Sequence, residues 1–535
     1  MAKEKIVEIK TIKQVLGQNV QQFADKVAYK IREGEGYRQL TYKQVGEKVA
    51  QLQSFMAKLG IVPGDRIALI SENRPEWPIT YLAVTAMGAV AVPLDAMLRK
   101  EEILPLIEDS EPKLMFCTQK YTEYVKGTAW ENKAVLMEEF DKLPAAGEKV
   151  NNEVKPESLA AIVYTSGTTG APKGVMLTHY NIISDVLNTL QVVKVYPNDI
   201  WLSVLPLHHT FETTCGFFGA FVPGTTVIYA ESLKSHAILA NMQDNGITIM
   251  CGVPLLYQLF YEGILREVEE KKMMPVFRVL FGLSAFFKFF GLHIGRTLFG
   301  MVHKKFGGKI RMFVAGGAAM DLKVLKNFEL MGFNLIQGYG MTEAAPIITC
   351  NYIGMNRLGS VGKVIPGVTV KINEKNGEIL TKGSNVMQGY YKRQSLTDEV
   401  IIDGWLHTGD VGYMDKDGFV FITGRCKDVI VTASGVNVYP EEIEHWLKQI
   451  PAIKEVCVMG SRVKEGFRKG SEEVAAVIVP NEGKTEEEIK AAIAEVNKKL
   501  AEYKRVARTI FRKEELPKTR LLKIKRFVVR KEMGL

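Results

Sequence analysis

The segment from Tyr164 to Val175 reads Tyr-Thr-Ser-Gly-Thr-Thr-Gly-Ala-Pro-Lys-Gly-Val and is suited to binding phosphate. It follows an apolar run, 159–163, that is typical of a buried strand. Glycines let backbone N–H groups turn toward an anion, while the hydroxyls and Lys173 add donors and a positive charge. The G-x-x-x-x-G-K-[ST] spacing is absent, so the pattern predicts a phosphate loop of another kind. Taken alone, such a run also fits a polar surface loop between a strand and a helix.

A second group of residues combines close-packing glycines with a carboxylate. Residues 337–343 read Gln-Gly-Tyr-Gly-Met-Thr-Glu, and residues 315–318 read Ala-Gly-Gly-Ala. The glycines permit a flat ring to approach the backbone, and Tyr339 can stack on a base. Thr342 can donate to a phosphate, and Glu343 can hold Mg2+, which prefers one or two carboxylates together with phosphate oxygens and water. Singly, these residues also fit turn glycines, a core tyrosine and a surface glutamate.

Three further polar motifs follow toward the C-terminus. Residues 405–410 read Trp-Leu-His-Thr-Gly-Asp, and an aspartate after a tight turn suits a two-oxygen grip on ribose hydroxyls. This motif alone fits equally an aspartate that closes a turn before the hairpin at 415–418. The other two motifs are residues 424–428 (Gly-Arg-Cys-Lys-Asp) with 434–444, and residues 517–526 (Pro-Lys-Thr-Arg-Leu-Leu-Lys-Ile-Lys-Arg).

The five motifs, in this order and over nearly the whole chain, resemble those of the adenylate-forming superfamily. Residues 337–343, 385–391 and 437–444 look most like AMP-forming fatty acyl-CoA synthetases, the long-chain fatty acid–CoA ligases. The resemblance implies that a carboxylic acid reacts with ATP to give acyl-AMP and pyrophosphate. The thiol of coenzyme A then takes the acyl group and releases AMP. ATP, Mg2+ and coenzyme A as co-substrate are the expected small-molecule partners.

The resemblance also implies roles for individual residues. The β- and γ-phosphates are expected at Thr165, Ser166, Gly167, Thr168, Thr169 and Lys173. The adenine slot is expected at Gly316, Gly317, Ala318, Gln337, Gly338 and Tyr339. Thr342 would touch the α-phosphate, Glu343 the magnesium, and Asp410 and Arg425 the ribose hydroxyls.

Four expectations concern catalysis and domain movement. Lys523 matches the catalytic lysine that bridges the carboxylate and the α-phosphate, although Leu522 stands before it where the family usually has glycine. Lys427 matches the hinge about which the small domain rotates between half-reactions. Gly435 would line the tunnel for the pantetheine arm of coenzyme A. His209 would lie beside the bound carboxyl group, with a satisfied core histidine as the alternative.

The expected fold is that of the adenylate-forming enzymes. Strands near 66–70, 91–94, 113–117, 226–229 and 247–250, with a helix over 77–90, predict α/β architecture with largely parallel sheets. We therefore expect a large N-terminal α/β domain with two α/β sheets plus a small β subdomain, which begins near residue 354. A small, mobile α+β C-terminal domain follows. The expected boundaries are 1–424, a hinge at 425–427, and 428–535.

Composition limits the class of protein. A chain of 535 residues needs at least two domains, and 47% hydrophobic with 24% charged residues is ordinary for a globular protein. The six cysteines are scattered without a C-x-x-C pair, which argues against a disulfide framework and fits a cytoplasmic enzyme. The net charge is +9, but basic residues near the C-terminus alternate with apolar ones, so no nucleic-acid partner is expected.

The segment 276–302 leaves two interpretations open. It is rich in Phe and Leu but is interrupted by charged residues, so it is not a clean membrane span. A partly buried helix pair is the preferred prediction. The alternative is an amphipathic patch that meets a greasy substrate or a membrane, which would place the protein peripherally at the inner membrane face. Either a monomer or a homodimer is compatible with the sequence.

The leading functional hypothesis is ligation of a medium- or long-chain fatty acid to coenzyme A. A second hypothesis keeps the adenylation but changes the substrate to an aryl or other acid, or the acceptor to a carrier-protein thiol. A third, supported only by Leu522, is a nucleotide-binding homologue with impaired catalysis.

Overall fold

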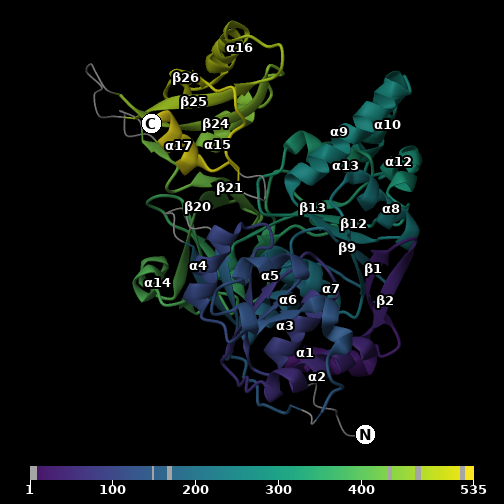
Figure 1. Ribbon diagram of the computed structural model, residues 1–535. Coiled ribbons are helices and arrows are strands. Elements are labelled where there is room, and N and C mark those ends of the chain that lie inside the picture. Colours follow the sequence, from purple (N-terminus) through teal and green to yellow (C-terminus); the bar gives the residue numbers. More distant parts are fainter. Residues whose placement is uncertain (1–8, 148–149, 166–171, 432–436, 464–471, 519–523) are drawn as a thin grey trace. The chain divides into compact units, whose positions relative to one another are not determined.

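The structure, a computed structural model, describes residues 9–147, 150–165, 172–431, 437–463, 472–518 and 524–535 (Figure 1). The chain forms two compact units. Unit 1 consists of Met1–Thr369 and Thr381–Leu406, and unit 2 of Val370–Leu380 and His407–Leu535. This division lies within the predicted N-terminal domain, and the hinge at 425–427 stays a prediction.

A mixed sheet of nine strands forms one half of unit 1. Its central strands, from β13 to β1, are parallel, and antiparallel strands complete both edges. In spatial order the strands are β15 (Lys363–Val364), β14 (Ile347–Cys350), β13 (Leu335–Gly340), β12 (Met312–Ala315), β11 (Ile249–Gly252), β9 (Ile200–Ser203), β10 (Thr226–Tyr229), β1 (Val27–Glu33) and β2 (Gly36–Thr41).

A second mixed sheet of unit 1 has seven strands. Its parallel part runs from β7 to β6, and two antiparallel strands extend it. The order is β18 (Gly389–Tyr390), β8 (Lys173–Thr178), β7 (Leu159–Thr165), β4 (Val90–Pro93), β3 (Arg66–Ile70), β5 (Leu114–Cys117) and β6 (Ala134–Leu136).

The alternation of side chains along these strands divides the core. In β3, Ile67 and Leu69 join the large core that includes strands of both sheets, whereas Ala68 and Ile70 join a smaller core on the opposite face. Both faces of the seven-stranded sheet are therefore covered, as expected for parallel strands connected by helices. This shared core holds the two sheets of unit 1 in one rigid frame.

The helices of unit 1 pack on these sheets. Threonines cap three of them, since Thr11, Thr41 and Thr178 each accept a backbone N–H at a helix start. Figure 1 shows α8, α9, α10, α12 and α13 gathered beside β9, β12 and β13. The helices are α1 (Ile12–Gln22), α2 (Tyr42–Lys58), α3 (Glu76–Ala86), α4 (Lys100–Ser110), α5 (Gln119–Val125), α6 (His179–Val192), α7 (Gly219–Phe221), α8 (Ser235–Asn245), α9 (Pro254–Glu270), α10 (Met274–Phe289), α11 (Gly295–Leu298), α12 (Gly300–Lys305), α13 (Leu322–Leu330) and α14 (Gln394–Val400).

A five-stranded sheet follows, and the division between the units passes through it. It comprises β16 (Val368–Ile372), β17 (Glu378–Gly383), β20 (Trp405–Met414) and β19 (Ile401–Ile402), with β21 (Val420–Arg425) paired to β20. The rest of unit 2 contains the sheet β24 (Ile453–Arg462), β25 (Glu472–Pro480) and β26 (Arg508–Phe511), the pair β22 (Ile430–Val431) and β23 (Asn437–Val438), and the helices α15 (Pro440–Leu447), α16 (Glu486–Lys499) and α17 (Arg526–Met533).

The fold class predicted from the sequence is confirmed, with three local corrections. The helix expected over 77–90 ends at Ala86, because Gly88 has φ +88° and β4 starts at Val90. The alternative of a polar loop between a strand and a helix is wrong, because strand β8 follows the candidate phosphate loop. The segment 276–302 forms the long helix α10 followed by two short helices, α11 and α12.

Gly340, at the end of β13, offers a sharp test of this packing. A Cβ at this position would lie 1.7 Å from the Pro346 carbonyl oxygen, which is a backbone atom. We expect Gly340→Ala to lower the free energy of unfolding by about 3 kcal/mol, measured by denaturant titration. Gly263→Ala in α9 is the matched control, since nothing lies within 4 Å of its Cβ position. Similar midpoints for the two variants would contradict the described geometry.

Candidate active site

The carboxyl ends of four neighbouring parallel strands lie at one edge of the nine-stranded sheet. Strands β13, β12, β11 and β9 are adjacent in that order. Ligands of open α/β sheets bind beyond such strand ends, because the loops there diverge and expose backbone groups. Residues singled out in the sequence lie just beyond three of these ends: Thr342 and Glu343 after β13, Gly316 and Gly317 after β12, and His209 after β9. Val253 follows β11, and His208 precedes His209.

The glycine pair after β12 packs closely against neighbouring groups at this edge of the sheet. The Gly316 N–H donates to the Gly252 carbonyl oxygen at 3.3 Å, and Gly317 has φ +82°. A Cβ on Gly316 would lie 3.0 Å from the Phe211 ring. A glycine at 316 therefore allows the ring to pack against the backbone. Of the other residues predicted to line the adenine slot, Gln337, Gly338 and Tyr339 lie in β13, and Ala318 follows the glycine pair. Their role stays a prediction.

Glu343 is held by residues from the other sheet. It lies in the short 3-10 turn η4 (Thr342–Ala344), and its side chain is almost fully buried. The Tyr390 hydroxyl, from β18, donates to the Glu343 carboxylate at 2.7 Å, and the Met387 N–H donates to the Glu343 carbonyl oxygen at 2.9 Å. Burial, followed by the charge of Glu343, raises the pKa of Tyr390, so this hydroxyl keeps its proton and remains a donor.

Tyr390 also contacts the lysine of the predicted phosphate loop. The Lys173 Nζ lies 5.0 Å from the centroid of the Tyr390 ring, a cation–π contact. Lys173 begins β8 directly opposite Thr165, the last residue of β7, so the two frame the ends of the hairpin connection. The predicted residues Ser166, Gly167, Thr168 and Thr169 lie in this connection, outside the described residues. Tyr390 thus contacts both Lys173 and Glu343.

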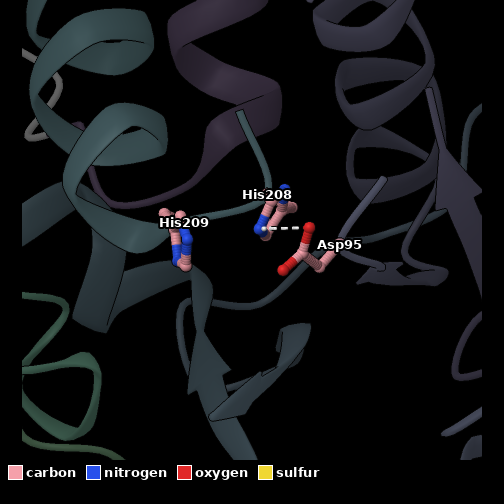
Figure 2. Close-up of side chains that lie close together, drawn as sticks. All are labelled: Asp95, His208 and His209. Atoms are coloured by element: carbon pink, nitrogen blue, oxygen red, sulfur yellow. Dashed lines mark ion pairs between the residues drawn. The ribbon is translucent and has the colours of Figure 1, made fainter. Parts of the chain in front are cut away.

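Two adjacent histidines and an aspartate form a cluster beside this region (Figure 2). The His208 Nε2 lies 3.4 Å from an Asp95 carboxylate oxygen, and the His208 and His209 ring centroids are 4.2 Å apart. Asp95 comes from the seven-stranded sheet, two residues beyond β4. Thr210 follows His209 in the sequence, and its hydroxyl oxygen lies 3.3 Å from that of Thr342.

The histidine rings are neutral at physiological pH. Burial lowers the pKa of His208 to about 3 and that of His209 to about 3, the latter with a contribution from His208. The Nε2 atoms of both rings are buried and accept or donate no hydrogen bond among the described residues. Buried polar atoms of this kind are normally satisfied by a ligand or water. His209 therefore fits a place beside a bound polar group better than a satisfied core histidine.

A separate group of predicted residues lies in unit 2. Asp410 and Arg425 are direct partners across β20 and β21, and the Arg425 Nε lies 2.8 Å from an Asp410 carboxylate oxygen. The turn before Asp410 is braced by Glu378, which accepts from the Gly409 N–H at 3.0 Å and lies 3.0 Å from the His407 Nδ1. Asp410 is buried and its carboxylate is oriented by the guanidinium.

The C-terminal motif is described only at its flanks, because Lys523 and Leu522 lie outside the described residues. Lys518 forms an ion pair with Glu455, and its backbone pairs with that of Ile524. The Lys525 N–H donates to the Pro517 carbonyl oxygen at 2.8 Å. Lys518 thus has a structural partner, and the role of Lys523 stays a prediction.

Arg526 anchors the segment that follows. Its guanidinium lies 3.3 Å from Asp428, 2.7 Å from Glu441 and 2.6 Å from Glu444. Lys427, the predicted hinge residue, is in the turn that follows β21, directly before Asp428. Gly435, predicted at the pantetheine tunnel, is outside the described residues.

Sequence reasoning missed several residues of the site. Tyr390, Asp95 and Glu378 were not proposed, although each holds a predicted residue or its neighbour in place. The run Asn-Val-Met-Gln-Gly-Tyr-Tyr at 385–391 carried a signal for Tyr390, since an aromatic hydroxyl after a glycine in an edge strand can reach a neighbouring loop. No local signal marks Asp95 or Glu378.

Comparisons with known proteins agree with this arrangement. The model of the AMP-binding enzyme family matches residues 16–391, and that of the AMP-binding enzyme C-terminal domain matches residues 442–523. The chain is 30% identical to the putative acyl–CoA ligase YdaB of Bacillus subtilis, covering 93% of this chain and 95% of that protein. It is 29% identical to a long-chain-fatty-acid–CoA ligase of the same species, over 97% and 93% of the two chains.

A solved structure shows the same fold. The o-succinylbenzoate CoA synthetase MenE of Bacillus subtilis, in complex with its acyl-adenylate intermediate, has a TM-score of 0.79 and 25% identity, covering 96% of this chain and 97% of that one. The same enzyme has been solved with ATP and a magnesium ion. With the family model matching most of the chain, the order of the motifs and their position at the strand ends have one common explanation: the chain is a member of the AMP-binding enzymes, the adenylate-forming superfamily.

Proposed function

We propose that this enzyme is an AMP-forming ligase that joins a medium- or long-chain fatty acid to coenzyme A. Membership of the family carries the coarser part, ATP-dependent activation of an acid to acyl-AMP and ligation to coenzyme A. The observation that carries the proposal is the Tyr390 contact, which holds a candidate phosphate-binding cation and a candidate magnesium ligand side by side.

The fatty acid is the finer step of the proposal. It is supported by the 29% identity to a long-chain-fatty-acid–CoA ligase over nearly the full length of both proteins. The burial of the histidines after β9 is a second support, because apolar surroundings favour an acid whose binding energy comes from its apolar chain. The neighbouring Phe211 packs against the large apolar core, next to the residues proposed to face the carboxyl group.

The residues of unit 1 fit ATP with Mg2+. A buried carboxylate held by one donor is a suitable ligand for Mg2+, which would neutralise charge on the phosphate oxygens when bound. We assign Glu343 to the metal, Thr342 to the α-phosphate, and Lys173 with Thr165, Ser166, Gly167, Thr168 and Thr169 to the β- and γ-phosphates. The adenine ring would lie against the backbone of Gly316 and Gly317, beside Ala318, Gln337, Gly338 and Tyr339.

The residues of unit 2 would complete the reaction. Asp410, oriented by Arg425, presents carboxylate oxygens suited to the two ribose hydroxyls. Lys523 would bridge the acid and the α-phosphate, lowering their mutual repulsion while the carboxylate oxygen attacks phosphorus and the bond to pyrophosphate breaks. In the second step the thiol sulfur attacks the acyl carbon, and the bond to AMP breaks. Lys427 would serve as the hinge between the steps, and Gly435 would leave room for the pantetheine arm.

An aryl acid is the second candidate substrate. The observation that favours it is the similarity to MenE, an o-succinylbenzoate CoA synthetase, which extends over almost the whole chain. A carrier-protein thiol as acceptor, or a catalytically impaired homologue, has weaker support. Leu522, which supports the hypothesis of impaired catalysis, lies outside the described residues.

AMP release with a panel of acids tests the proposed function. We expect release that depends on both ATP with Mg2+ and coenzyme A, and that rises to a maximum at one fatty-acid length. Each added buried CH2 group should raise kcat/KM about four-fold until the pocket is filled. A maximum on an aryl acid would show that the substrate is an aryl acid and not a fatty acid. Exchange of pyrophosphate without use of coenzyme A would show that the acceptor is not coenzyme A.

Lys523→Ala tests the assignment of the catalytic lysine. We expect acyl-AMP formation to fall roughly a hundred-fold or more, because a charge aimed at the transition state is lost. Thioester formation from supplied acyl-AMP should stay within about two-fold of wild type, since that step needs no bridge between a free carboxylate and the α-phosphate. Lys525→Ala is the matched control, because its described contact is made by the backbone and survives the change. Equal loss in both half-reactions would refute the assignment.

Tyr390→Phe tests the contact that supports the metal assignment. Phenylalanine keeps the ring but removes the donor to Glu343, so the apparent affinity for Mg2+ in the presence of ATP should fall about ten-fold or more. Tyr391→Phe is the control, since it also removes one hydroxyl while keeping the ring that lies 5.1 Å from the Lys392 Nζ. If the two variants titrate alike with Mg2+, Tyr390 does not hold the metal ligand.

A further inference from the structure

Helix α10 presents an apolar face to the outside of unit 1. Phe289 is 86% exposed, and Phe286, Phe290, Val279, Val276 and Leu283 are also exposed. We call these six residues the α10 apolar face. Figure 1 shows α10 at the outer edge of the unit, beside α9 and α13. Contiguous exposed apolar surface of this kind is unusual for a soluble domain and marks an interaction site.

The outward direction of this face is fixed by packing on the opposite side of the helix. Phe277 and Phe281 lie edge-on against Phe299, with ring centroids 5.4 Å and 5.0 Å away. The Ser284 hydroxyl donates to the Leu330 carbonyl oxygen at 2.6 Å. At 3.6 residues per turn, these buried positions lie opposite the exposed ones. The helix therefore cannot hide its apolar face by rotating in place.

The charge of the surrounding segment has one sign. Residues 271–310 contain no Asp or Glu, and their basic residues are Lys271, Lys272, Arg278, Lys288, Arg296, Lys304, Lys305 and Lys309. Arg278 is exposed within the same arc of α10 as the apolar face. Some of this charge is balanced locally, since Lys288 pairs with Glu329 and Lys271 with Glu267. The adjacent helix α9 carries the exposed Glu262, Glu269 and Glu270, but the eight basic residues of 271–310 outnumber them, so an excess of positive charge remains around α10.

We propose that the α10 apolar face docks on the surface of an anionic phospholipid bilayer, with the helix lying in the plane of the interface. Aromatic side chains would enter the boundary between headgroups and acyl chains, while the basic residues meet lipid phosphates. No helix among the described residues is long and apolar enough to cross a membrane, and α10 has only 16 residues. The helix thus lies on the bilayer and does not span it.

A second copy of the chain is the main competing occupant, and charge argues against it. A two-fold dimer through this face would bring the same basic segment of each copy together. Like charges across an interface oppose association, whereas an anionic surface attracts them. The proposal concerns a surface apart from the ATP site and does not depend on the identity of the acid.

Vesicle flotation with the purified full-length protein tests this inference. We expect binding to phosphatidylcholine vesicles only when phosphatidylglycerol is included, and weaker binding as salt is raised. The variant Phe286→Ser/Phe289→Ser/Phe290→Ser should reduce the partition coefficient about ten-fold or more. The matched control is Leu59→Ser/Met97→Ser/Leu233→Ser, three exposed apolar residues elsewhere in unit 1, which should bind like wild type.

A charge variant keeps the test independent of the phenylalanines. Arg278→Glu should lower partition to anionic vesicles several-fold while leaving the thermal midpoint unchanged, because the side chain is exposed. Failure of wild type to float, equal binding to neutral vesicles, or equal loss in the control triple variant would overturn the proposal. So would a dimer, seen by sedimentation velocity without lipid, that the phenylalanine variant dissociates.

Discussion

The hydrogen bond from the Tyr390 hydroxyl to the Glu343 carboxylate is the contact on which the geometry of the candidate site depends. Tyr390 belongs to an edge strand of the seven-stranded sheet, and Glu343 follows the last parallel strand of the nine-stranded sheet. Both side chains are buried, so losing the bond would leave a buried polar group without this partner, at a cost of about 1–3 kcal/mol. One buried contact therefore joins an edge strand of one sheet to the turn that follows a strand of the other.

Neighbouring contacts reinforce the same junction. The Asn385 side chain donates to the Ile347 carbonyl oxygen at 2.8 Å, and Asp185 accepts from the Ile347 N–H at 3.1 Å. Asp185 is fully buried, and burial raises its pKa well above the usual value. Such groups are costly to separate from their partners. The turn that carries Glu343 is thus followed by a strand, β14, whose first residue is held by two buried side chains.

The sequence predicted much of this arrangement because its signals are local. Glycines such as Gly316 and Gly317, and the turn before Asp410, reveal themselves through residue type and neighbours, and parallel strands bring their ends together by topology. Tyr390 could not be assigned in this way, because its partner Glu343 is 47 residues away and the pairing depends on how two sheets share a core. Asp95 beside His208 is a similar case, since no pattern near either residue indicates the other.

The ion pairs of Arg526 join a residue next to the predicted hinge to a residue near the C-terminus of the chain. Asp428 directly follows the predicted hinge residue Lys427, and Arg526 comes shortly after the predicted catalytic Lys523. Removing one partner of this partly buried charge cluster would leave the opposite charges without compensation, so its members resist separation. A torsional change at Lys427 would move Asp428, and the ion pair would pass this movement to Arg526. Rotation at the predicted hinge would then be coupled to the position of helix α17, which begins at Arg526.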